Sequence, residues 1–356
     1  MKRRGFIKKA LSGSLAVAAS GVVAAPYVHA SPKKYRWRLV TTFPPRLPIF
    51  QDGAHRLAKR VKEMSEGRLN IQVFAGGELV PPMGTFDAVS QGTVECGYGA
   101  AYYWGGKETA CQWFTTVPFG LDAQGFNSWI YSGGGQQLWE ETYAPFNLVP
   151  RLVANTGPQM GGWFNKEINT IADFKGLKMR IPGLGGKVVS KAGGTVVLLP
   201  AAEIFTSLER GVLDATEWVG PLHDLRMGFY KAAKFYYYPG WHEPSAGLEI
   251  IFNKDKYDAL PKSLQLILDS AAAETNAWSL SEFDARNGAA LQELVTKHKV
   301  QLKPFPQQLI DQLRPLAKET LEEEADKTKQ ARKVHDAFKK FQQEIGEWRA
   351  MSGKLY

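Results

Sequence analysis

The sequence of 356 residues has few of the residues and motifs that mark common enzymes and metal-cluster proteins. It contains two cysteines and six histidines, and no C-x-x-C, H-E-x-x-H, G-x-G-x-x-G or G-x-S-x-G pattern. These absences argue against thiol-redox, zinc-hydrolase, dinucleotide-binding and serine-hydrolase chemistry. Cys96 and Cys111 form either a disulfide or two buried free thiols, because their spacing does not decide between them.

Long apolar runs are also lacking, apart from one at the N-terminus. Five basic residues precede the run from Ala10 to Ala25, and small Ala30 suits a cleavage site. This order predicts an export signal over residues 1–30, of the twin-arginine type because of K-R-R-G-F-I-K-K. Lys2 stands where such signals usually have Ser or Thr. A membrane anchor is the alternative, but the run is shorter than the roughly 20 residues that span a bilayer.

The mature chain, expected to begin near Ser31, has little excess charge. Loss of five positive charges with the signal lowers the formal net charge from +9 to +4, which does not favour nucleic acid as a partner. The predicted location is the periplasm. A remainder of about 326 residues fits two packed lobes better than one core.

The first half of the mature chain alternates between strand and helix patterns. Strands are predicted at 35–42, 68–74 and 94–99, and helices at 50–66 and 83–91. This series favours a parallel sheet covered by helices. A further helical stretch over 123–143 is interrupted by G-G-G at 133–135.

A second series of strands follows. They are predicted at 148–155, 160–164, the end of 171–182, 214–220, 234–239 and 247–253. From Pro261 the pattern is mostly helical, with Pro315 near a helix start or kink. Residues 306–349 carry an apolar stripe at helical spacing, formed by Ala331, Val334, Ala337, Phe338, Phe341, Ile345 and Trp348. The fold class is therefore α/β, with two lobes, a ligand cleft between them and a long C-terminal helical region.

Ligands in open α/β sheets lie beyond the carboxyl ends of strands, and unusual polar and aromatic residues occur at or near the ends of predicted strands and in one turn. They are Tyr102, Tyr103, Gln159, Arg180, Glu217, Trp218, Trp241, His242 and Glu243. In D-A-T-E-W-V-G, Glu217 sits within an apolar strand pattern, and burial of an ionised carboxylate needs a cation or several donors. The alternative is that Glu217 pairs with a neighbouring Lys or Arg.

Several of these segments resemble one family. F-K-G-L-K-M-R-I-P is similar to the signature of DctP-type solute receptors of tripartite ATP-independent periplasmic (TRAP) transporters. N-T-G-P-Q-M-G-G-W-F, D-A-T-E-W-V-G-P and Y-Y-Y-P-G-W-H-E look like the branch that binds 2-oxo acids, and more broadly 2-hydroxy acids, with a metal cation. The resemblance covers nearly the whole mature chain.

The resemblance implies roles for individual residues. Arg180 matches the arginine that holds the ligand carboxylate, and its planar guanidinium suits two parallel hydrogen bonds. Gln159 matches the residue that reaches both cation and ligand. Glu217, the Trp218 carbonyl and Glu243 complete a set of hard oxygen ligands, which suits Na⁺ or Ca²⁺.

Tyr102 is a further expected ligand contact, although Tyr102 and Tyr103 fit packing between the lobes equally well. His242 departs from the branch, where a second tryptophan follows Trp241, and a smaller polar ring changes the room for the ligand tail. A role for His242 outside the ligand contacts, or at the surface, is the alternative.

The resemblance also implies an organisation and partners. Lobe I is expected to comprise residues 31–157 and 246–285, lobe II residues 158–245 and 286–305, and a C-terminal extension residues 306–356. A small organic acid and the TRAP membrane subunits are the implied partners, and a homodimer is implied through the C-terminal helix. The helix folding back on its own chain is the alternative. A periplasmic enzyme exported by the twin-arginine route and acting on a small organic acid is the rival function.

Overall fold

The computed structural model describes residues 33–352, so the predicted signal peptide at 1–30 lies outside the described part of the chain. The chain divides into a unit of residues 1–33 and a second unit that begins at Lys34 and contains all the elements below. No helix within residues 33–352 combines the length and the apolar character that crossing a bilayer requires.

The first lobe is built on a five-stranded sheet in the order β2-β1-β3-β10-β4. Its strands are β1 (Tyr35–Thr41), β2 (Leu69–Phe74), β3 (Cys96–Gly99), β4 (Leu148–Asn155) and β10 (Gly247–Asn253). β1 pairs in parallel with β2 and β3, which confirms the parallel pairing predicted for the first three strands. β10 is antiparallel to both β3 and β4, so the whole sheet is mixed.

Six helices of the described chain cover this sheet. They are α1 (Phe50–Met64), α2 (Thr85–Ser90), α3 (Ala123–Ser132), α4 (Gly135–Tyr143), α8 (Lys254–Asp258) and α9 (Lys262–Thr296). α1 buries an apolar face formed by Leu57, Ala58 and Val61 and packs on β2, while α9 packs on β4. The gap between α3 and α4 falls at the predicted glycine run, where Gly134 adopts φ of 84°.

The second lobe is built on a six-stranded sheet in the order β11-β9-β5-β8-β6-β7. Its strands are β5 (Gly162–Phe164), β6 (Lys178–Arg180), β7 (Thr195–Val197), β8 (Ala215–Thr216), β9 (Phe235–Tyr238) and β11 (Gln301–Pro304). α5 (Gly183–Lys191) and α6 (Ala201–Glu209) connect its parallel strands, and α7 (Pro221–Met227) follows β8. The exact residue bounds expected for the two lobes stay a prediction.

Two sequence predictions need correction, and one strand was not predicted. The strand expected at 214–220 contains only Ala215 and Thr216, because the chain turns away after Glu217 to begin α7 at Pro221. β11 was not predicted, since its four residues form a short polar edge strand beside β9. For Pro315, the helix-start alternative is wrong, because Pro315 lies inside α10, which leaves the kink alternative. Pro315 is exposed there, so water can satisfy the carbonyl that loses its helical donor.

The two cysteines are free and buried, which resolves the alternatives that their spacing left open. Cys96 lies in β3 and Cys111 in the short helix η3 (Thr109–Phe114). Burial raises the pKa of both thiols well above the ordinary value, and nearby carboxylates raise it further. Both side chains therefore act as small apolar core residues.

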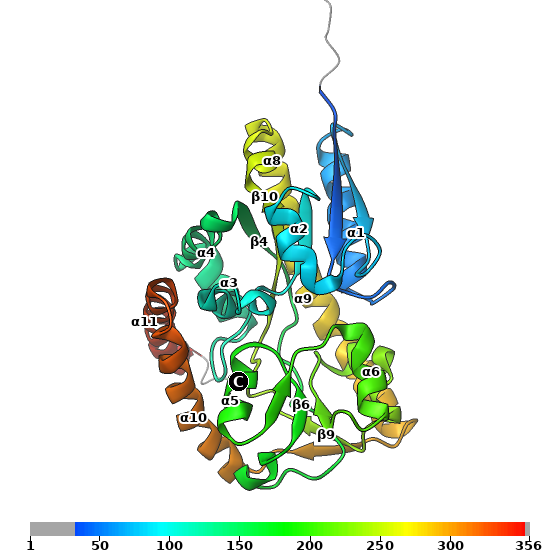
Figure 1. Ribbon diagram of the computed structural model, residues 1–356, viewed down its shortest axis with the longest axis vertical. Coiled ribbons are helices and arrows are strands. Elements are labelled where there is room, and N and C mark those ends of the chain that lie inside the picture. The colour runs from blue at the N-terminus through cyan, green and yellow to red at the C-terminus, as the bar shows by residue number, and fades with distance from the viewer. Residues whose placement is uncertain (1–32, 353–356) are drawn as a thin grey trace, which may run out of the picture. The chain divides into compact units, whose positions relative to one another are not determined.

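The C-terminal helices contact both lobes of their own chain. α10 (Gln307–Ala325) packs beside α5 of the second lobe, and α11 (Lys329–Ser352) packs beside α3 and α4 of the first (Figure 1). Phe338 is 2% exposed and meets Trp129 edge-on, with ring centroids 5.0 Å apart. The apolar stripe is therefore largely covered by its own chain, as in the alternative in which the helix folds back. Trp348 remains 65% exposed.

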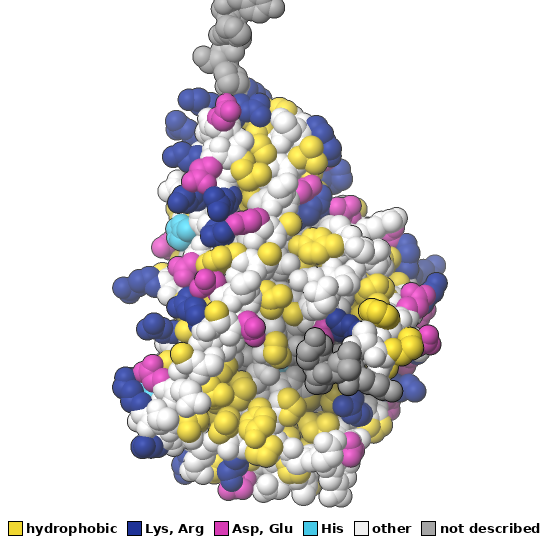
Figure 2. Space-filling model, turned by 180° about the vertical axis from the view of Figure 1, so that it is seen from behind, with side chains coloured by type: hydrophobic (Ala, Val, Ile, Leu, Met, Phe, Trp, Pro, Cys, Tyr) yellow, Lys and Arg dark blue, Asp and Glu magenta, His cyan; other side chains and the backbone are white. Residues whose placement is uncertain are grey.

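Charged residues of both signs share the surface. On the face shown in Figure 2, lysine and arginine side chains are interspersed with aspartate and glutamate. Many form exposed ion pairs, such as Lys191 with Glu319 and Glu323 at 2.8 and 2.6 Å. Each such pair contributes about 0–1 kcal/mol to stability. Each lobe is therefore stabilised mainly by its apolar core.

Candidate functional site

Two charged side chains leave the second sheet at the same edge. β6 ends at Arg180, which pairs in parallel register with Thr216, the last residue of β8. Glu217 follows directly, so both side chains emerge at the carboxyl ends of neighbouring strands. Arg180 Nη1 donates to Glu217 Oε1 at 2.5 Å and to the Glu217 carbonyl oxygen at 3.1 Å. Both residues are fully buried, with 1% and 0% exposure.

The turn after β9 brings a second carboxylate and an imidazole to this pair. His242 Nε2 lies 3.4 Å from Glu217 Oε2, and Glu243 is the next residue. Glu217, His242 and Glu243 each offer one possible metal-ligand atom, and these atoms all lie within 4.8 Å of one another. All three side chains are at most 1% exposed. The surface alternative for His242 is therefore wrong.

Gln159 joins the cluster from the segment that precedes β5. Its backbone N–H donates to the Glu243 carbonyl oxygen at 3.3 Å, and its carbonyl oxygen accepts from Gly240 at 3.0 Å. The side-chain Nε2 donates to Thr156 Oγ1 at 3.2 Å. That bond fixes the amide so that Oε1 is the free acceptor, and Oε1 has no hydrogen-bond partner in the described structure.

Aromatic rings enclose the charged cluster. The Arg180 guanidinium carbon lies 5.1 Å from the ring centroid of Trp218, at cation–π distance. From the first lobe, Tyr102 stacks on Tyr103 with centroids 4.9 Å apart. Tyr102 also meets α5 of the second lobe: Gly183 has φ of 61°, and a Cβ there would lie 2.5 Å from the Tyr102 ring. Glycine at 183 thus lets the two lobes approach closely at the site.

The cluster contains a carboxyl group with a shifted pKa and several polar atoms without hydrogen-bond partners in the described structure. Burial raises the pKa of Glu243 well above its ordinary value, and the neighbouring Glu217 raises it further, while Arg180 opposes the shift. Several buried atoms lack a hydrogen-bond partner among residues 33–352: Gln159 Oε1, Arg180 Nη2, His242 Nδ1 and Glu243 Oε2. The two carboxylates and the imidazole lie close enough to share a cation, and the amide oxygen of Gln159, which has no partner in the described chain, is a further hard donor. The free Nη2 donor fits an anion beside it.

A surface groove lies near this cluster, and its lining includes Tyr102 but none of the cluster's charged residues. It has a volume of about 470 Å³ and lies between the lobes, where Tyr102 and Tyr103 face Pro182, Gly183 and Lys187. Glu324 of α10 also lines it. Because Tyr102 borders both the groove and the buried cluster, the groove marks where the cleft between the lobes reaches solvent.

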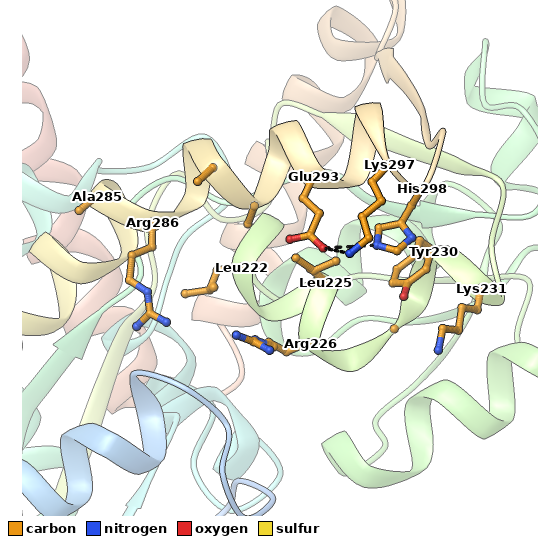
Figure 3. Close-up of a pocket in the computed structure, with 13 residues that line it drawn as sticks. Leu222, Leu225, Arg226, Tyr230, Lys231, Ala285, Arg286, Glu293, Lys297 and His298 are labelled. Atoms are coloured by element: carbon orange, nitrogen blue, oxygen red, sulfur yellow. Dashed lines mark hydrogen bonds and ion pairs between the residues drawn. The ribbon is translucent and has the colours of Figure 1, made fainter.

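Another pocket lies away from the predicted residues. It has a volume of about 570 Å³ and is formed by α7 and the C-terminal half of α9 (Figure 3). Arg226 and Arg286 reach into it, and Glu293 is held by Lys297 at 2.9 Å. Its one carboxylate is thus already paired, and the lining otherwise offers basic and apolar groups and the side chain of Tyr230. This pocket does not provide the oxygen ligands that a cation requires, so we place the candidate site at the interlobe cluster.

Comparison with known families agrees with this geometry. The model of the family of bacterial extracellular solute-binding proteins, family 7 (DctP), matches residues 39–328. The chain belongs to this family. The predicted resemblance is therefore confirmed, and so is the prediction that the chain is a solute-binding receptor rather than an enzyme.

Individual relatives of this solute-binding protein cover almost its full length. The monocarboxylate 2-oxoacid-binding periplasmic protein of Nostoc sp. is 42% identical, over 100% of this chain and 98% of its own. A TRAP periplasmic solute-binding protein from Pseudoalteromonas atlantica, with bound sodium and pyruvate, is 43% identical with a TM-score of 0.88, over 91% of this chain and 98% of its own.

A third relative shows the same fold with a different cation. A TRAP solute-binding protein from Bordetella bronchiseptica is 38% identical with a TM-score of 0.88, over 91% of this chain and 96% of its own. It is a mixed-occupancy dimer, with a bound active site that holds copurified calcium and picolinate and with an apo site. The predicted two-lobed fold with long C-terminal helices is confirmed by this similarity.

All the site residues predicted from sequence lie in or beside the one cluster. Sequence reasoning gave less weight to Tyr103 and His242. Burial raises the pKa of Tyr103 as it does that of Tyr102, and the charges of Arg180 and Glu217 act on both side chains. For His242, the available signal was its place between Trp241 and Glu243 in a turn with two other candidate residues. Tyr103 gave no signal beyond its adjacency to Tyr102.

Proposed function

We propose that this protein is a periplasmic receptor that binds a small 2-oxo monocarboxylate, such as pyruvate or the related 2-hydroxy acid lactate, together with Na⁺ or Ca²⁺. It delivers the acid to the membrane subunits of a TRAP transporter. The observation that carries the proposal is the buried Arg180, with a free Nη2 donor beside a triad of possible metal ligands. Relatives with similar folds bind pyruvate with sodium, or picolinate with calcium.

Each residue has a role in this proposal. Arg180 binds the carboxylate of the acid, and Tyr102 contacts the ligand from the first lobe. Gln159 Oε1 reaches both cation and acid, since that oxygen has no other partner within the described chain. Glu217, Glu243 and the Trp218 carbonyl bind the cation. Burial first and the nearby Glu217 second raise the pKa of Glu243, and the cation offsets the repulsion between the two carboxylates.

The decisive experiment identifies the ligand directly. Freshly purified protein is denatured, and the released small acids are identified by mass spectrometry with metal analysis alongside. A monocarboxylate with a 2-oxo or 2-hydroxy group is expected. Incubation of the protein with the same acid should leave the acid unchanged, whereas turnover would favour the rival periplasmic enzyme.

The cation and the acid are expected to strengthen each other's binding. If both share one site, the gain is reciprocal, and coupling between bound ligands typically changes affinity about 5–150-fold. Calorimetric titration of pyruvate after chelation, in buffer with choline in place of sodium, should therefore give a weaker Kd than titration with Ca²⁺ added. An unchanged Kd in a demonstrably metal-free sample would remove the cation from the mechanism.

We also propose a homodimer held by the C-terminal extension at residues 306–356. Trp348 and Met351 are 65% and 68% exposed near the end of α11, and apolar surface of this kind favours an interface. Light scattering at tens of micromolar should give twice the monomer mass. Trp348→Glu combined with Met351→Glu should give the monomer mass, and Leu266→Glu, at another exposed apolar residue, should not. A monomeric wild-type protein would leave α10 and α11 as a brace of their own chain.

A further inference from the structure

Phe119 connects the first lobe to the turn that carries His242 and Glu243. Its backbone N–H donates to the Trp241 carbonyl oxygen at 2.9 Å. Its ring also stacks on Trp241, with centroids 5.7 Å apart and planes 26° apart. Trp241 directly precedes the candidate metal ligands His242 and Glu243. Phe119 therefore contacts both the backbone and the ring of the residue next to them.

Both C-terminal helices hold Phe119 from the other direction. Arg314 of α10 places its guanidinium carbon 4.5 Å from the centroid of the Phe119 ring. Gln342 of α11 donates its Nε2–H to the Phe119 carbonyl oxygen at 3.2 Å. The backbone donor, the backbone acceptor and the ring of Phe119 are therefore all engaged. These residues also line a pocket of about 240 Å³ between α10, α11 and residues 117–119.

The backbone of Phe119 is in an uncommon conformation. Its φ is 56°, in the left-handed region that bulky residues rarely adopt. Such a conformation costs free energy and persists where the surrounding contacts over-determine it. Here those contacts come from two directions, the site turn on one side and the C-terminal helices on the other.

We infer that Phe119 is a positioning residue through which α10 and α11 hold the cation-binding turn in place. The inference rests on the proposed function, because it concerns the same acid and cation. If Arg314 and Gln342 release Phe119, the 239–244 turn loses a support, and Glu243 and His242 are held less firmly toward Glu217. Cation affinity falls first, and acid affinity falls with it because the two are coupled.

The test uses a double variant and a matched control on the same two helices. Arg314→Ala with Gln342→Ala removes both contacts to Phe119, and neither residue lies in the site. Lys318→Ala with Gln343→Ala changes two nearby side chains for which the described structure has no hydrogen bond or ion pair. Pyruvate is titrated calorimetrically in sodium-free buffer, once at low and once at saturating Ca²⁺.

At low Ca²⁺, the Arg314/Gln342 variant should bind pyruvate about tenfold more weakly than wild type, within the usual range of coupling between ligands. Saturating Ca²⁺ should restore the Kd to within about twofold, because excess cation compensates for weaker cation binding. The control should match wild type at both concentrations. Phe119→Ala should reproduce the Ca²⁺-dependent loss, and Phe119→Tyr, which keeps the ring, should bind nearly as wild type.

Other results would overturn the inference. A pyruvate Kd that is unchanged in the Arg314/Gln342 variant means that the C-terminal helices do not support the turn. A loss of equal size at low and saturating Ca²⁺ means that the variant damages the fold generally. If wild type binds pyruvate normally in either case, the proposed function stands. If wild type binds no 2-oxo or 2-hydroxy acid, the proposed function fails and this inference fails with it.

Discussion

Replacing Arg180 by alanine is expected to abolish binding of the acid. Arg180 is 1% exposed and its Nη2 donor has no partner in the described structure, so it is the group available to meet a ligand carboxylate. Loss of a buried, hydrogen-bonded charge partner costs on the order of 2–5 kcal/mol of binding free energy. Calorimetry with pyruvate at saturating Ca²⁺ measures this loss directly.

Two further variants distinguish the ligand contact from a general effect on folding. Arg180→Lys keeps the positive charge beside Glu217 but loses the planar pair of donors, so it should bind weakly while it melts closer to wild type. Arg38→Ala removes an exposed ion pair with Glu95 on the first lobe, and its affinity should equal that of wild type. If Arg180→Ala keeps a Kd within about threefold of wild type, the assignment of the carboxylate contact is wrong.

Replacing Glu217 by alanine is expected to impair both stability and cation binding. The Arg180–Glu217 pair is buried on both sides, and removal of one partner leaves an uncompensated buried charge. Such removal typically costs about 3–5 kcal/mol of the free energy of unfolding. Urea denaturation in metal-free buffer measures that loss, and Ca²⁺ titration should show no binding.

Glu243→Gln is the matched comparison, because Glu243 is equally buried but is not paired with Arg180. The raised pKa of Glu243 indicates that its ionised form is unfavourable in the metal-free protein. Its neutral replacement should therefore leave the metal-free protein as stable as wild type, or more stable, and should still weaken cation binding. If Glu217→Ala and Glu243→Gln have the same unfolding free energy, the ion pair with Arg180 does not stabilise the fold.

Local patterns were sufficient for the parts of the site that follow strands. The strand ending at Arg180 is set by K-M-R-I-P, where the helical connection begins directly after the proline. The strands predicted at 148–155 and 247–253 have the observed bounds of β4 and β10. Resemblance, rather than periodicity, supplied the roles expected of Gln159, Glu217 and Glu243, because no spacing rule joins residues that lie 58 and 26 positions apart.

Contacts between distant segments were not predictable in the same way. The short β8 ends where the chain leaves the sheet for α7. The composition of the whole segment 214–220 resembled that of a longer strand. β11 forms because β9 offers an edge, which its own four residues do not reveal. Coverage of Phe338 depends on Trp129, which lies more than 200 residues earlier in the chain. Phe119 gave no signal, since its importance comes from partners on three separate segments.

α9 has a mechanical consequence for how the lobes move. Its 35 residues make a continuous rod about 50 Å long, packed on α1 and β4 in the first lobe and on α7 in the second. Because it has no break between these contacts, rotation of one lobe against the other must flex the rod. A long helix curves gently rather than folding at a point, so flexing produces an elastic restoring torque. The resting angle between the lobes is therefore set partly by the stiffness of α9, and ligand contacts must supply the work that bends it.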